Sequence, residues 1–335
     1  MKLLLTLLFS GLTLAQTWTS QNSTTTASFR GVSAVSAKIA WASGTNGTWL
    51  RTADGGATWA ASQVPGAEAL DFRDVQAVDG RTGYLLSIGA GDKSRIYKTI
   101  DGGRQWKLLY TNPDPKGFLD AMAFWDARHG IVVGDPVDGH FEVLTTDDGG
   151  DHWQRRQTPP AMPNEGAFAA SGTCVAVMGT GDAWFGTGGV GGARVFHSGD
   201  GGATWTVATT PIRNDAAAAG IFSLAFSDTR HGIAVGGDYT KPEDAERNIA
   251  VTADGGKTWT DPAGVPPHGF RSAVAFLPDS KMWIATGTSG SDASSDGGKT
   301  WKLFDSGNYN AVSLISSKAG FAVGPKGRVA GFAAR

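Results

Sequence analysis

A short box that recurs six times along the chain constrains its fold more than any other feature. Each copy reads Ser or Thr, any residue, Asp-Gly-Gly, two further residues and Trp. The box tryptophans follow one another at intervals of 47, 47, 52, 54 and 42 residues, at positions Trp59, Trp106, Trp153, Trp205, Trp259 and Trp301. A period of about 40 to 50 residues with several strand-like runs per period is typical of β-propeller blades.

The apolar runs around each box indicate four strands per repeat. In the first unit, the runs are 32–35, 39–41 and 48–51, and a fourth opens at Trp59. In the second unit, they are 74–78, 83–88, 95–99 and 106–110. Four short strands in the same order in each repeat predict a four-stranded antiparallel blade.

The box has a mechanical explanation in the hairpin between the third and fourth strands. Gly supplies the positive φ angles of a tight turn, and the Asp carboxylate accepts hydrogen bonds from backbone N–H groups there. The Trp is expected to fill the wedge between neighbouring blades. Six copies of one carboxylate predict a structural role, rather than a catalytic or metal-binding one, for Asp54, Asp101, Asp148, Asp200, Asp254 and Asp296.

The number of strand-like runs exceeds the number of boxes and predicts a seventh blade. After Trp301 the chain contains three more runs, 309–315, 320–324 and 327–332, without a box. The missing strand is found at the other end, where the segment beginning at Trp18 lines up with the segment beginning at Trp59. An amino-terminal strand that closes the last blade would remove both open edges of the ring. We therefore predict an all-β, seven-bladed propeller closed in this way.

The composition excludes several other classes of protein. With 48 Gly among 335 residues a helical bundle is excluded, because each Gly inside a helix costs about 1 kcal/mol. The 29 Lys and Arg nearly balance the 31 Asp and Glu, so that no positive excess points to nucleic acid or to an anionic membrane. No stretch has about 18 consecutive apolar residues, and we expect no transmembrane segment. We expect the ring to be a monomer.

The first fifteen residues resemble an export signal. Lys2 is followed by the apolar run 3–9 and then by small or polar residues up to Ala15. So short a run is typical of a cleaved secretory signal peptide. We predict cleavage near Ala15, a single domain over 16–335, and a secreted or periplasmic protein. Cys174 is the only cysteine, so that disulfides within the chain are excluded and a buried thiol is expected.

No motif for a cofactor or a metal stands out. Gly186, Gly188 and Gly191 match G-x-G-x-x-G, but the strand-like run 193–197 follows them where a dinucleotide site would need a helix. We therefore expect a Gly-rich hairpin there. The six His are scattered, without an H-E-x-x-H motif or a Cys/His cluster, so that neither a metal nor a cofactor is predicted.

Arginines recur at one register of the predicted innermost strands, which line the channel of a propeller. These strands begin Phe29-Arg30, Phe72-Arg73, Phe118-Leu119-Asp120, Gly166-Ala167, Gly220-Ile221, Phe270-Arg271 and Tyr309-Asn310. Three guanidiniums at a channel mouth would suit a carboxylate, sulfate or phosphate, because the planar fork donates bidentate hydrogen bonds. The alternative is a structural network in which these arginines pair with Asp71, Asp74, Asp120 and Glu165. The candidate residues for a ligand or partner are Arg30, Arg73, Asp74, Asp120, Glu165, Arg271 and Asn310.

Two connections between strands stand out by composition. The segment 157–165 joins the third and fourth units, and its three Pro residues are expected to stiffen a surface connection. The charged insertion 238–247 lengthens the fifth unit. Such an extension is expected to be a solvated loop, with contact to a partner as the alternative.

The box with its Trp resembles the Asp-box, or BNR, repeat of sialidases, sortilin-type receptors and related propellers. Three longer phrases resemble the photosystem II stability/assembly factor-like family more closely: GIVVGDP at 130–136, GIAVGGD at 232–238 and GFAVGPKGRVAGF at 320–332. The resemblance covers essentially the whole mature chain. It implies a propeller that acts as a binding or assembly platform for a protein partner or an anionic ligand. Some bacterial relatives carry the label oxidoreductase, and no residue pattern here supports that label.

A glycoside hydrolase is the alternative from a different class. Sialidases also carry an arginine cluster on a propeller, the first within a Phe-Arg dipeptide, and this resemblance implies a Tyr nucleophile with a separate acid/base carboxylate. Candidates are Glu165, Asp74, Tyr239 and Tyr309, although no spacing singles them out. The six blades of sialidases differ from the seven predicted here. We therefore predict a binding platform, keep hydrolysis of an anionic glycan as the alternative, and assign no catalytic residue.

Overall fold

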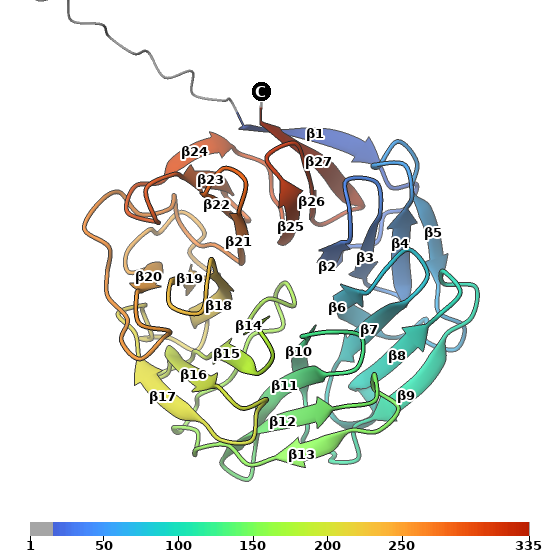
Figure 1. The fold of residues 1–335 in the computed structure, drawn as a ribbon, viewed down its shortest axis with the longest axis horizontal. Coiled ribbons are helices and arrows are strands. Elements are labelled where there is room, and N and C mark those ends of the chain that lie inside the picture. Colours follow the sequence, from blue (N-terminus) through green and yellow to red (C-terminus); the bar gives the residue numbers. More distant parts are fainter. Residues whose placement is uncertain (1–15, 335) are drawn as a thin grey trace, which may run out of the picture.

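Seven small sheets stand around a central axis like the blades of a propeller (Figure 1). The computed structural model describes residues 16–334, and the signal peptide predicted for residues 1–15 lies outside them. Six sheets have four antiparallel strands and one has three. Within the described residues the only helix is a 3₁₀ turn, η1 (Gly91–Lys93), and no helix is long and apolar enough to cross a membrane. The prediction of an all-β, seven-bladed propeller is confirmed.

Each of the first six blades takes consecutive strands, from the axis outward. Blade 1 consists of β2 (Phe29–Ala34), β3 (Ala40–Gly44), β4 (Thr48–Thr52) and β5 (Ala60–Gln63). Blade 2 consists of β6 (Asp71–Ala77), β7 (Gly83–Ile88), β8 (Arg95–Thr99) and β9 (Lys107–Thr111). Blade 3 consists of β10 (Leu119–Phe124), β11 (Gly130–Val137), β12 (His140–Thr146) and β13 (Gln154–Arg156). Blade 4 consists of β14 (Val175–Met178), β15 (Asp182–Gly186), β16 (Arg194–Ser198) and β17 (Thr206–Thr209). Blade 5 consists of β18 (Ala219–Phe226), β19 (Gly232–Asp238) and β20 (Ile249–Thr252). Blade 6 consists of β21 (Ala273–Leu277), β22 (Met282–Gly287), β23 (Gly290–Ser294) and β24 (Lys302–Asp305).

Blade 7 joins the two ends of the chain. It consists of β25 (Ala311–Ser316), β26 (Ala319–Val323), β27 (Arg328–Ala334) and, outermost, β1 (Gln16–Asn22). Strand β1 pairs with β27 along its whole length, from Gln16 opposite Ala334 to Asn22 opposite Arg328. The amino-terminal strand thus closes the last blade, as the sequence predicted.

The innermost strand of blade 4 differs from the prediction. Its expected position began at Gly166, whereas β14 begins at Val175. Gly166 makes only an isolated bridge to Gly188, and the Phe168 ring stacks on Phe222 of blade 5 with ring centroids 3.9 Å apart. This stack draws the segment 166–170 out of its own blade and toward the channel. Blade 5 also departs from the four-strand pattern, because its outermost strand is reduced to one bridge between Val251 and Thr260.

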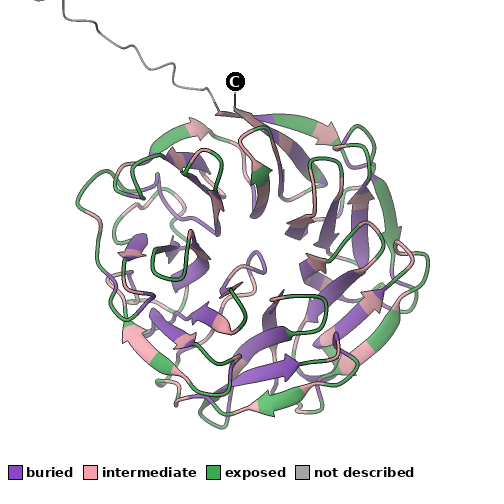
Figure 2. Ribbon diagram, in the orientation of Figure 1, coloured by how far each residue is buried: buried purple, intermediate pink, exposed green. Residues whose placement is uncertain are grey.

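The box tryptophans pack into apolar clusters that neighbouring blades share. Trp59 of blade 1 meets Phe321 of blade 7 edge to face, with ring centroids 5.5 Å apart. Trp301 lies in the cluster between blades 5 and 6, and Trp18 of β1 occupies the equivalent position between blades 6 and 7. The inner strands of each blade are buried, whereas outer strands such as β5 are largely exposed (Figure 2). The wedge-filling role predicted for the tryptophan is therefore what the structure has.

The aspartate of each box is engaged inside its own turn. In the first copy, the Thr52 hydroxyl donates to Asp54, and the Thr58 N–H donates to the same carboxylate at 2.9 Å. Gly55 and Gly56 have φ angles of 80° and 85°, which favour glycine. Hydrogen bonds from Thr58 and then from Thr52 lower the pKa of Asp54 to about 2. The same pattern recurs at the other five boxes.

Candidate functional site

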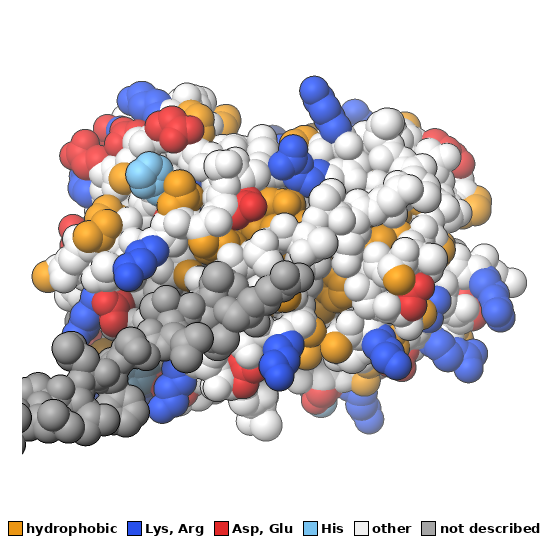
Figure 3. Space-filling view, turned by 90° about the horizontal axis from the view of Figure 1, so that it is seen from above, with side chains coloured by type: hydrophobic (Ala, Val, Ile, Leu, Met, Phe, Trp, Pro, Cys, Tyr) orange, Lys and Arg blue, Asp and Glu red, His pale blue; other side chains and the backbone are white. Residues whose placement is uncertain are grey.

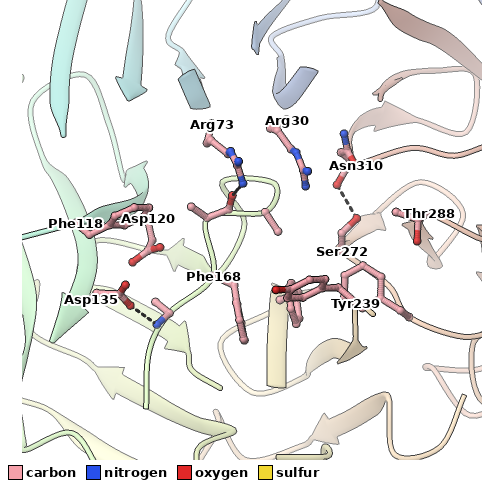
Figure 4. Close-up of a pocket in the computed structure, with 15 residues that line it drawn as sticks. Arg30, Arg73, Phe118, Asp120, Asp135, Phe168, Tyr239, Ser272, Thr288 and Asn310 are labelled. Carbon is pink, nitrogen blue, oxygen red and sulfur yellow. Dashed lines mark hydrogen bonds between the residues drawn. The ribbon is translucent and has the colours of Figure 1, made fainter. Parts of the chain in front are cut away.

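A cavity of about 440 Å³ lies where the innermost strands meet around the axis. Arg30 of β2 and Arg73 of β6 form one side, and Asp120 of β10 and Asp135 of β11 lie on another (Figure 4). The remaining lining consists mainly of aromatic and small side chains from blades 4 to 7. Elsewhere charge is mixed: on the flank seen in Figure 3, acidic and basic side chains are interspersed.

The two arginines of the cavity differ in how they are engaged. Arg73 donates from Nε to Asp71 at 2.9 Å and from Nη1 to the Ala169 carbonyl at 3.0 Å. Arg30 makes no ion pair and no hydrogen bond with any residue between 16 and 334. Burial is the main cause that lowers the pKa of Arg30, followed by repulsion from Arg73. Arg30 therefore holds unused donors in a partly desolvated position, where hydrogen bonds to an anion are strong.

Two carboxyl groups form the acidic side of the cavity. Asp120 is only 1% exposed, and its Oδ2 atom has no hydrogen-bond partner among the described residues. Asp135 accepts a hydrogen bond from the Ala167 N–H at 2.9 Å. Burial raises the pKa of both, and repulsion from Asp135 raises that of Asp120 further. Burial therefore disfavours the charged form of both acids.

An aromatic wall faces the charged groups. Phe222 stacks on Phe168 and meets Phe270 edge to face at 4.7 Å between ring centroids. Tyr239, which follows β19, is half exposed at the rim and packs on the edge of Phe222. Ligand pockets are usually walled by apolar and aromatic side chains with a few placed polar groups. The cavity has this composition.

Four of the seven residues predicted from the sequence line the cavity: Arg30, Arg73, Asp120 and Asn310. Asn310 donates from Nδ2 to the Phe29 carbonyl at 2.8 Å, which ties blade 7 to blade 1. Arg271 does not reach the cavity, because its guanidinium is fully buried in blade 6. There it pairs with Asp292 and donates to the Ser289 hydroxyl at 2.9 Å. The expected convergence of three arginines is therefore reduced to two.

Asp74 and Glu165 also lie away from the cavity. Asp74 is buried and accepts a hydrogen bond from the Met122 N–H at 2.7 Å, which joins blade 2 to blade 3. Glu165 is buried against Arg194, whose Nε donates to it at 2.9 Å. Both carboxyls serve contacts between segments of the ring, and neither pairs with Arg30, Arg73 or Arg271.

Sequence reasoning missed Asp135 and the aromatic wall. Asp135 lies on β11, the second strand of blade 3, whereas the predicted candidates come from the innermost strands and the residues next to them. A usable signal was its position in GIVVGDP, where an acidic residue ends an apolar strand. The rings of Phe168, Phe222 and Phe270 fall in the aligned innermost segments, but the prediction there rests on charged and amide side chains.

The insertion 238–247 is more restrained than a solvated loop. Arg213 donates from Nε to Asp215 at 3.1 Å and forms an ion pair with Asp244. Lys241 lies 3.8 Å from Asp238. These contacts hold the segment that carries Tyr239 at the rim of the cavity.

The remaining sequence candidates stay structural. Gly186, Gly188 and Gly191 belong to the hairpin between β15 and β16, as predicted. Cys174 is buried immediately before β14. Among residues 16–334, no group of three or more His, Cys, Asp or Glu side chains is placed to hold a metal ion.

The buried carboxyl of Asp74 predicts a measurable dependence of stability on pH. Burial raises its pKa to about 8, against 3.8 for the model acid, although hydrogen bonds from Met122 and Val75 oppose the shift. Between these values the folded state holds more protons than the unfolded state. The free energy of unfolding should therefore fall as pH rises from 5 to 8, by up to roughly 1.4 kcal/mol per pH unit. Urea unfolding at both pH values measures this fall. Asp74→Asn should reduce it, and an unchanged slope in this variant would contradict the assignment.

Comparisons with known proteins agree with the fold. No protein-family model matches the chain, and no curated protein matches it. Among solved structures, the chain is similar to "YCF48 bound to D1 peptide", with a TM-score of 0.67 and 19% identity over 95% of this chain and 97% of the other. It is also similar to YCF48 from Cyanidioschyzon merolae, with a TM-score of 0.65 and 18% identity over 95% and 99% of the two chains. It is also similar to the structure of U3-55K, with a TM-score of 0.64 and 13% identity over 95% of this chain and 98% of the other. These likenesses support membership of the propeller fold.

Proposed function

We propose that this chain is a binding platform that holds a segment of a partner protein in the axial cavity. The observation that carries the proposal is Arg30, a partly buried guanidinium without a partner among residues 16–334, at the mouth of an aromatic-walled cavity. Two arginines face this side, and the one carboxylate beside them, Asp71, pairs with Arg73 alone. The surplus donors suit a carboxylate or another anionic group of the partner.

The aromatic wall supplies the apolar part of such a site. Phe168, Phe222 and Phe270 come from three consecutive blades and form one continuous surface. Rings held by tertiary contacts lose little conformational entropy when a ligand packs on them. A peptide segment with an apolar side chain beside an anionic group fits both halves of the cavity.

The comparisons lend support from outside the chain. One structural neighbour is a YCF48 propeller bound to a peptide, described as a D1 peptide, and it covers nearly the whole chain. The phrases at 130–136, 232–238 and 320–332 resemble the photosystem II stability/assembly factor-like family. We therefore propose an assembly or binding role rather than a catalytic one.

The glycosidase alternative gains little from the geometry. Tyr239 lines the cavity, but its hydroxyl makes no hydrogen bond to a carboxylate among the described residues. A Tyr nucleophile needs such a base within hydrogen-bond reach. Arg271, the third arginine of the expected cluster, pairs with Asp292 instead.

We also propose that the platform works outside the cytoplasm. The support is the charged and then apolar segment up to Ala15, which resembles a signal peptide. Mass spectrometry of the chain from its native cells should find an amino terminus near Gln16. A chain that retains Met1 in the cytoplasmic fraction would contradict export.

Peptide selection tests the proposed function. A random peptide library displayed on phage is selected on the chain from residue 16, and the enriched peptides are synthesised and their affinities measured by fluorescence polarisation. Arg30→Gln should weaken their binding about 10- to 100-fold, because one charge-assisted hydrogen bond is worth about 1.5–3 kcal/mol.

An exposed arginine provides the matched control. Arg104 lies in the turn between β8 and β9, away from the cavity, and Arg104→Gln should leave the affinity unchanged. Equal affinity of the Arg30 variant and the wild type would remove the cavity from the binding site. Failure to enrich any peptide would contradict the proposed function itself.

A further inference from the structure

The acidic side of the cavity has a polar atom for which the protein provides no partner. Asp120 is 1% exposed, lines the cavity, and leaves Oδ2 without a hydrogen bond among residues 16–334. Buried polar atoms are normally paired, so that an unpaired one beside a cavity indicates a missing donor. Asp135 lies next to it on the adjacent strand, and its carboxyl also lines the cavity (Figure 4).

Neither of these two carboxyls forms an ion pair with a cation among residues 16–334. Asp135 and Arg73 act on Asp120, and both carboxyls interact with the Cys174 thiol. Of these only Arg73 is positive, and it is already bonded to Asp71 and to the Ala169 carbonyl. Arg30 lies on the arginine side (Figure 4). One side of the cavity therefore presents guanidinium donors and the other presents carboxyl groups.

We infer that Asp120 and Asp135 form a subsite for a primary ammonium group of the bound segment, opposite the anion that Arg30 and Arg73 receive. The inference rests on the proposed function and extends it from an anionic ligand to one that carries both charges. The ammonium comes from a lysine side chain or from a free amino terminus, which share this chemistry.

The surroundings favour an organic cation over a metal ion. Two carboxyls fall short of the six to eight oxygen ligands that Ca²⁺ takes, whereas an ammonium needs only three acceptors. The rings of Phe118 and Phe168 also line the cavity. Aromatic faces attract ammonium groups and compensate part of the cost of removing them from water.

The subsite also predicts that binding is linked to protons. In the empty cavity, burial raises the pKa of Asp120 well above its ordinary value and raises that of Asp135. An ammonium favours the ionised carboxylates, so that its binding releases protons. Affinity should consequently increase as pH rises.

Three small probes isolate the ammonium and distinguish its two sources. Nα-acetyl-lysine N-methylamide carries only the side-chain ammonium, norleucine N-methylamide carries only the α-ammonium, and Nα-acetyl-norleucine N-methylamide carries neither. Binding to the chain from residue 16 is measured by calorimetry in two buffers that differ in ionisation heat and that contain neither a primary amine nor phosphate. We expect one ammonium probe to bind at least about tenfold more tightly than the neutral probe and to release about one proton.

The variants test whether the two carboxyls are responsible. Asp120→Asn and Asp135→Asn keep the shape of the neutral acids, and each should lower the affinity for the ammonium probe about tenfold or more. Asp138→Asn is the matched control, because Asp138 lies exposed in the β11–β12 turn of the same blade at a φ angle of 52° that Asn tolerates. Thermal melting establishes whether each variant folds. Because Asp120 and Asp135 are substituted separately, the two variants provide independent tests.

Wild-type affinity in both folded variants would overturn the inference, as would equal binding of the neutral probe. Binding of CaCl₂ that is lost in Asp120→Asn, without ammonium binding, would also overturn it in favour of a metal site. If the phage-selected peptides still require Arg30 while acetylation of their amines changes nothing, the ammonium subsite fails and the proposed function stands. If no selected peptide binds at all, both fail.

Discussion

Trp18→Ala is expected to lower the free energy of unfolding by about 3–5 kcal/mol, the usual cost of truncating a buried Trp. Trp18 is 7% exposed and lies between blades 6 and 7. Its ring centroid is 5.1 Å from that of Phe332 and 5.6 Å from that of Tyr309. Its indole N–H donates to the Ser291 hydroxyl of blade 6 at 3.0 Å. The substitution leaves a cavity at the point where β1 closes the ring and removes one of the two hydrogen bonds of the Ser291 hydroxyl, which keeps its bond with Thr286. Urea unfolding of the chain from residue 16 measures the loss.

Thr19→Ala serves as the control for this prediction. Thr19 is on the same strand, pairs with Gly331 through its backbone, and exposes its side chain. Its replacement should change the free energy of unfolding by no more than about 0.5 kcal/mol. If Trp18→Ala behaved like Thr19→Ala, the amino-terminal strand would not be a closing element of the ring.

Asp292→Asn is expected to destabilise the fold by about 3–5 kcal/mol, because it leaves the charge of Arg271 buried without a counter-ion. Arg271 is fully buried and Asp292 is 1% exposed. The Arg271 Nε donates to the carboxylate at 2.7 Å. Burial is the main cause that lowers the pKa of Arg271, and attraction to Asp292 opposes it. Chemical unfolding of the single variant measures the loss.

The double variant Arg271→Met/Asp292→Leu tests the reason for that loss. Because both charges are removed together, its stability should return to about the wild-type value or above it. Selected peptides should bind the double variant like the wild type, since Arg271 does not line the cavity. A double variant as unstable as Asp292→Asn would show that the uncompensated charge is not the cause.

Much of the fold could be predicted because short sequence motifs, repeated along the chain, determine the turns and the spacing of the strands. The box specifies a turn through Asp54, Gly55 and their five equivalents, and its spacing specifies the blade. The seventh blade followed from the three strand-like runs after Trp301, and its closing strand from the likeness of Trp18 to Trp59. The innermost strand of blade 4 could not be predicted in the same way, because the Phe168–Phe222 stack that displaces it is a contact between blades.

The candidate site was predicted only in part, for a related reason. The aligned register of the innermost strands correctly predicted that Arg30 and Arg73 lie at the cavity. The orientation of the Arg271 side chain depends instead on Asp292, which lies 21 residues away on β23. Alignment of the innermost strands does not identify Asp135, because this residue lies on the second strand of its blade, beside a β-bulge between Gly134 and Pro136. Sequence alignment of repeats identifies equivalent backbone positions, whereas side-chain partners differ from blade to blade.

A crystal structure of the chain with one phage-selected peptide tests the central claim most directly. The account predicts peptide density in the axial cavity, with an anionic group within hydrogen-bond distance of Arg30 and an apolar side chain against Phe222. A peptide bound to the perimeter of the ring or along an outer strand, with the cavity empty, would contradict it.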